Sequence, residues 1–183
     1  MLIDTAIEEA KEKGLLFPVH PIAGWVGEPR AFLMCKPLRD ELEKNKLDLD
    51  ESVRARWAKL EGSMQHFVGN GYMTRNRIKQ LEPAKFENWE LINKRPKPSL
   101  RVFGSFAKPD LFIGTHVKER NKLKGKFSVE FEIERIQSEQ IWKATGLPIN
   151  PKTGRPAVFS DAPEFRYEAY ITENASEKIQ VPL

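Results

Sequence analysis

Apolar residues recur at helical spacing over much of the first half of the chain. The clearest run lies between Asp50 and Gly69, where either Asp50 or Ser52 can cap the start of a helix. Its apolar positions are Val53, Trp57, Leu60, Met64 and Phe67. Shorter patterns of the same kind predict further helices over 3–13, 37–45 and 74–81.

In the second half the period changes to two residues, which is the side-chain repeat of a β-strand. Residues 89–93, 99–107 and 111–120 show this alternation and are predicted to be strands. A short strand is also predicted at 31–35, after a loop over 15–30 that is rich in proline and glycine. Together the two periods predict an α+β domain in which N-terminal helices pack on an antiparallel sheet.

Residues 127–135 fit both patterns. Their apolar side chains alternate with polar ones as in a strand, yet a helical stripe runs on into IQSEQIWKA. We expect a strand that gives way to a helix by about residue 136. After it, 148–164 is predicted to be a loop and 165–171 a last strand.

The strands 99–107 and 111–120 are expected to form a hairpin with a turn at Lys108-Pro109-Asp110. If Pro109 and Asp110 are its loop residues, position i pairs with position 219 − i. The register then places Arg101 opposite Lys118, Phe103 opposite His116, Val102 opposite Val117 and Gly104 opposite Thr115. One face of the hairpin is therefore aliphatic, and the other gathers cations around Phe103.

Composition describes an ordinary globular chain. It has 183 residues, of which 40% are hydrophobic and 31% charged, and it has no apolar run long enough to span a bilayer. The acidic, amphipathic start lacks the features of a secretion signal, and Cys35 is the single cysteine, so no internal disulfide forms. We expect a cytoplasmic protein with no metal and no cofactor, because neither metal-ligand spacing nor a phosphate-binding glycine motif occurs.

Positive charge is concentrated in one segment. Residues 94–126 hold ten Lys/Arg and two Asp/Glu, a net charge of +8, whereas the segments before and after are slightly acidic. A local basic cluster suits a polyanion such as RNA or DNA. The residues predicted to hold flanking phosphates are Lys94, Arg95, Lys97, Lys122 and Lys124.

The cationic face of the hairpin carries the candidate chemistry. Its members are Arg101, His116, Lys118 and Arg120. Arginine binds phosphate oxygens in a bidentate way and stabilises the charge of a pentacoordinate phosphate, while histidine exchanges a proton near neutral pH. These parts suffice for metal-free cleavage of RNA, whose 2′-OH is the nucleophile. A solvent face of a sheet with no ligand is the plainer alternative.

Residues 56–143 resemble the RelE/HigB-like toxins of toxin–antitoxin modules. The resembling stretches are ARWAKLEGSMQHFV, KQLEP, WELINKRPKPSLRVFGSFAKPDLFIGTHVKERNKL and the later IW. The resemblance implies a RelE/ParE-like core at 50–146, with an N-terminal extension at 1–49 and a C-terminal loop and strand at 147–183. It further implies a ribosome-associated endoribonuclease that cuts mRNA and is neutralised by an antitoxin.

The sequence departs from that family in one place that bears on catalysis. Many of these toxins carry a tyrosine or a second histidine after the last strand, where this chain reads NKLKGKFSVEF. Two alternatives therefore stay open. The first is a nucleic-acid- or ribosome-binding module without catalysis, or a gyrase inhibitor of the same fold, and the second is a module that binds an acidic protein.

Overall fold

A six-stranded sheet organises the chain. In the computed structural model the strand order is β1-β2-β7-β6-β5-β4, and neighbours are antiparallel except for the parallel pair β2 and β7. The strands are β1 (Leu16–Pro18), β2 (Ala31–Cys35), β4 (Ile78–Gln80), β5 (Trp89–Asn93), β6 (Leu100–Lys108) and β7 (Leu111–Glu119). A separate pair joins β3 (Met73–Thr74) to β8 (Gln180–Val181). The structure describes residues 3–22, 30–69, 73–74, 76–81, 87–125, 128–148 and 180–181.

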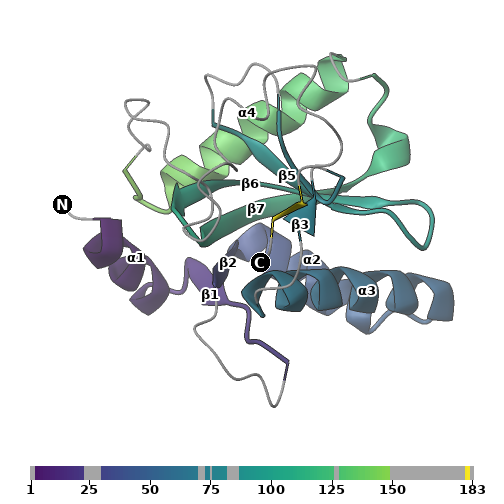
Figure 1. Cartoon of the computed structure of the whole chain (residues 1–183), viewed down its shortest axis with the longest axis horizontal. Coiled ribbons are helices and arrows are strands. Elements are labelled where there is room, and N and C mark those ends of the chain that lie inside the picture. Colours follow the sequence, from purple (N-terminus) through teal and green to yellow (C-terminus); the bar gives the residue numbers. More distant parts are fainter. Residues whose placement is uncertain are drawn as a thin grey trace.

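Helices cover both faces of this sheet (Figure 1). The helices α2 (Lys36–Lys46) and α3 (Glu51–Val68) pack on one face, where their apolar stripes meet Phe32, Val102 and Phe112. The helix α4 (Val129–Ala144) lies on the other face, where Trp142 joins a second core with α1 (Ile3–Glu12) and Ile113. The prediction of an α+β fold with helices packed on the sheet is confirmed, but the sheet is not wholly antiparallel as predicted, because β2 runs parallel to β7. The segment predicted to be an N-terminal extension supplies α1, α2 and two of the strands.

The long predicted helix begins as its cap residue indicates. Asp50 accepts a hydrogen bond from the Ser52 amide at 2.7 Å, which satisfies one of the free amides of the first turn of α3. The predicted helices at 3–13 and 37–45 and the predicted strands at 31–35 and 89–93 are also confirmed, each within two residues.

The strand predicted over 127–135 is wrong, because α4 begins at Val129. Ser128 caps it by accepting a hydrogen bond from the Phe131 amide at 3.4 Å. The alternation that suggested a strand does not follow burial: Val129 is 73% exposed and Ile133 54%. Among the described apolar residues of that alternating series, Phe131 alone turns inward, against Phe103 and its neighbours.

Two further predictions are corrected. The helix predicted over 74–81 is replaced by β3 and β4, because Ile78 pairs with Leu91 of β5 and is fully buried. The segment 15–30, predicted to be a loop, contains β1, which pairs with β2. The predicted strand 165–171, and the loop 148–164 beyond its first residue, lie outside the described residues.

The hairpin of β6 and β7 has the predicted register at its open end and again at the turn, where Lys108 faces Leu111, but the pairing between them is shifted by one residue. Arg101 faces Lys118 and Phe103 faces His116, as predicted, but Gly104 faces Gly114. The register shift leaves Thr115 as an extra residue on β7, which is the geometry of a β-bulge. Beyond it, Phe112 and Gly114 turn to the α2–α3 face, while Thr115 and His116 both contact α4.

Candidate nucleic-acid interface

The two most basic loops of the chain meet at one end of the sheet. Leu100 at the start of β6 pairs with Glu119 at the end of β7, and the Arg120 amide donates to the Ser99 carbonyl at 2.7 Å. The loop 94–99 therefore lies beside the segment 120–125. All five predicted phosphate-holding lysines and arginines stand on these two loops, so the sheet brings them together.

Within this basic end the cations differ in what neutralises them. Lys122 is 3.2 Å from the Glu119 carboxylate and Lys124 is 2.9 Å from that of Glu130. Lys94, Arg95 and Lys97 are exposed. Their side chains make no ion pair or hydrogen bond with the rest of the described chain. Their charge is therefore directed to solvent.

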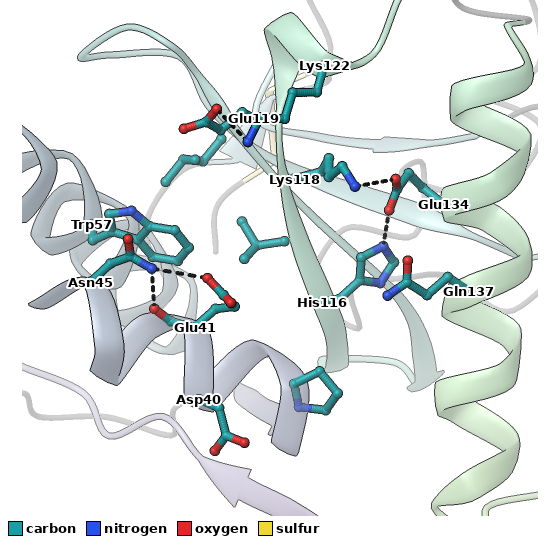
Figure 2. A pocket seen from close by; sticks show the side chains of 13 residues that line it. Asp40, Glu41, Asn45, Trp57, His116, Lys118, Glu119, Lys122, Glu134 and Gln137 are labelled. Atoms are coloured by element: carbon teal, nitrogen blue, oxygen red, sulfur yellow. Dashed lines mark hydrogen bonds and ion pairs between the residues drawn. The ribbon is translucent and has the colours of Figure 1, made fainter.

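His116 lies beneath α4 and has partners on every side. It is 5% exposed, its Nε2 lies 2.9 Å from Oε2 of Glu134, and its Nδ1 lies 3.0 Å from Oγ1 of Thr115. Its ring stacks on Phe103 with centroids 4.9 Å apart and planes 7° apart. Figure 2 shows the imidazole turned from β7 toward α4. Both ring nitrogens are thus engaged inside the protein.

Glu134 also neutralises Lys118. The Lys118 ammonium is 2.8 Å from Oε1 of Glu134, whose other oxygen meets His116 (Figure 2). Burial raises the pKa of Glu134, but the hydrogen bonds from His116 and Lys118 outweigh it and hold the pKa below its usual value. The pair of predicted catalytic residues on β7 therefore forms a buried network around one carboxylate.

Arg101 and Arg120 lie further along the same face. The Arg101 Nε is 3.8 Å from the carboxylate of Glu90, and its Nε and Nη1 are buried without a hydrogen-bond acceptor. Burial lowers the pKa of Arg101 and raises that of Glu90. Arg120 donates to the carbonyls of Leu123 and Lys124 and lies 5.6 Å from the ring of Phe131.

Sequence reasoning missed the residues that complete this network. Glu134 and Ser138 come from α4, and Ser138 lies 2.9 Å from the Thr115 hydroxyl. Read as a helix, the segment would have placed these two residues on one face, four positions apart. Because 127–135 was interpreted as a strand, the sequence predicted neither this shared face nor the helix that covers His116.

Two grooves open on this part of the molecule. The first, named here the mixed-charge groove, has a volume of about 520 Å³ and lies between α2, β7 and α4 (Figure 2). It exists because β2 pairs only with residues 111–114 of β7. Its lining includes both signs of charge, from Asp40, Glu41, Glu119 and Glu134 and from His116, Lys118 and Lys122.

The second, named the cationic groove, has a volume of about 630 Å³ and lies between α3 and the residues around β4 and β5. The cations that line it are Lys59, Arg77, Lys94 and Arg95, together with His66. Among the described residues that line it there is no aspartate or glutamate. Lys59 and Arg77 are new members of the basic surface that charge counting along the sequence did not select.

The fold and the interface thus define an α+β protein with a basic end to its sheet. The sequence matches no protein-family model and no curated protein. The resemblance to RelE/HigB-like toxins stays a prediction. In the part of the chain that the structure describes, no group of three or more His, Cys, Asp or Glu side chains is placed to hold a metal ion. No helix in that part is both long and apolar enough to cross a membrane.

Proposed function

We propose that this protein binds RNA through the basic end of its sheet and does not cleave it. The observation that carries the proposal is the state of Lys94, Arg95 and Lys97, which are exposed and have no carboxylate partner in the described chain. Three such cations, beside a second basic loop, form the electrostatic footprint of a phosphate-backbone contact.

Cleavage is the alternative that the resemblance implies. It would need a phosphodiester to reach a proton-transfer group, and His116 is the candidate on this face. That imidazole is 5% exposed, and Glu134 and Thr115 engage its nitrogens. The geometry therefore favours binding over cleavage. The ribosome and the antitoxin remain predicted partners.

The test measures binding of a fluorescently labelled single-stranded RNA by anisotropy, over a range of salt concentrations. We compare the wild type with the triple variant Lys94→Ala, Arg95→Ala, Lys97→Ala. Each lost phosphate contact removes about 0.7 from the salt slope for single strands, so three contacts weaken binding by about 100-fold at ~0.1 M salt. The same RNA, run on a denaturing gel after incubation, should stay intact.

Two results would overturn this proposal. If the wild type and the triple variant bind RNA with equal affinity, the loop 94–99 is not part of the interface. RNA cuts that appear with the wild type and disappear with His116→Ala would restore the endoribonuclease hypothesis. A triple variant of matched charge at exposed positions, Lys13→Ala, Lys36→Ala, Lys44→Ala, controls for the general loss of positive charge.

A further inference from the structure

The described lining of the cationic groove holds four lysines and arginines and no carboxylate. Most helical lysines pair with a carboxylate three or four residues away, as Lys11, Lys13 and Lys36 do with Glu8, Glu9 and Asp40. Lys59 on α3 and Arg77 before β4 are exposed and have no such partner among the described residues. They belong to the same groove. Lys143 on α4 also lacks such a partner among the described residues, so the groove is distinguished by the number of cations that it gathers.

The four cations of the groove are brought together by the tertiary structure and not by proximity in the sequence. Lys59 and Arg77 line the same groove because α3 packs on the sheet and the Ile92 amide donates to the Arg77 carbonyl at 2.6 Å. Lys94 and Arg95 follow directly from β5. Four cations in one concave site repel one another, and an anion bound between them relieves that repulsion.

The groove also contains groups that contact bases. His66 and the guanidinium planes of the two arginines offer stacking surfaces, and Ser63 and Asn76 offer hydrogen-bonding groups. On the α3 wall, Gly62 has no atom within 4 Å of where a side chain would begin, which leaves that wall open. A positively charged groove with planar side chains suits a single strand, whose bases are free to stack.

We propose that the cationic groove binds single-stranded RNA and continues the interface of the loop 94–99, which contributes Lys94 and Arg95 to both. The inference rests on the proposed function and deepens it, since it names the form of RNA and adds Lys59 and Arg77 as phosphate contacts. The strand passes from the basic end of the sheet into the groove between α3 and β5.

The experiment compares wild type with the double variant Lys59→Ala, Arg77→Ala, using the same labelled single-stranded RNA. Loss of two contacts should weaken binding by about 25-fold at ~0.1 M salt and lower the salt slope by about 1.4. The control, Lys36→Ala with Lys44→Ala, removes equal charge from α2 and should change the affinity less than about twofold. Both variants replace exposed side chains, and urea unfolding checks that they fold.

The outcomes separate this inference from the proposed function. If the triple variant of the loop 94–99 weakens RNA binding but Lys59→Ala, Arg77→Ala does not, the role of the groove is overturned and RNA binding by the loop still stands. No binding of RNA by the wild type overturns both. Equal competition by a duplex of the same sequence overturns the single-strand claim. Binding of labelled polyglutamate by a protein that binds no RNA assigns the groove to an acidic protein.

Discussion

The mixed-charge groove and the cationic groove both contain cations, yet they differ in what surrounds those cations. In the first, Lys118 and His116 share the carboxylate of Glu134, and Lys122 meets Glu119. In the second, the described lining holds no carboxylate, and Lys59 and Arg77 are unpaired within the described chain. A cation that its own fold neutralises stabilises the fold, whereas an unpaired cation is available to a ligand.

The cations that form one basic segment in the sequence therefore have two different roles in the structure. The hairpin cations near β7 belong to a buried network that joins the sheet to α4. The loop and groove cations face solvent. Substitutions in the first region should therefore alter stability, and substitutions in the second should alter RNA affinity.

The largest effect is expected where the hairpin is most tightly packed. In Gly104→Ala a new Cβ would contact the Ile113 carbonyl oxygen and lie 2.8 Å from Cζ of Phe112, so the strands must separate. We expect a loss of about 3 kcal/mol in the free energy of unfolding, measured by urea denaturation.

The matched control lies in the cationic groove. Gly62→Ala on α3 meets no atom within 4 Å and should stabilise the helix, by up to about 1 kcal/mol. A tolerated Gly104→Ala would show that β6 and β7 are not held as closely as the bulged register requires.

A smaller loss is expected from Glu134→Gln. The substitution removes the carboxylate that accepts hydrogen bonds from the buried His116 and pairs with the half-exposed Lys118. We expect a loss of about 2 kcal/mol at neutral pH, less than for a fully buried pair because solvent screens Lys118. Glu130→Gln on the same helix removes only an exposed partner of Lys124 and serves as the control.

The pH dependence of that loss has a defined sign. The folded pKa of Glu134 lies below its ordinary value of 4.5, so ionised Glu134 stabilises the fold above about pH 4.5, and this is lost as the pH falls through the folded pKa. The difference between wild type and Glu134→Gln should shrink between about pH 7 and about pH 3. A constant difference would assign the loss to packing.

Much of the hairpin could be predicted because one of its faces is aliphatic and the other is cationic. A one-residue slip would have placed Arg101 among aliphatic side chains, so the register at the open end was constrained. The bulge at Thr115 could not be predicted, because Thr115 suits either face and the reason for the shift, the close approach of Gly104 and Gly114, is tertiary. The first part of α4 was missed because three apolar residues of this helix, Val129, Ile133 and Ile136, are exposed.

One part of the candidate interface could also be predicted from the sequence, and another part could not. Charge counting found the loop 94–99, because its cations are neighbours in sequence. It did not select Lys59 and Arg77, which come together only when Ile78 pairs with Leu91 and α3 packs on the sheet. Sequence analysis also assigned proton transfer to His116. The carboxylate that engages this imidazole lies 18 residues away on a helix, so the sequence did not indicate the contact.

Crosslinking tests the central claim most directly. A single-stranded RNA containing 4-thiouridine is crosslinked to the wild-type protein, and the modified peptides are mapped by mass spectrometry. The account predicts crosslinks on α3 around residues 58–66 and on the loop 94–99, with the RNA intact. Crosslinks concentrated on β7 at residues 116–118, or on α4, would contradict it and would place the RNA at the hairpin face.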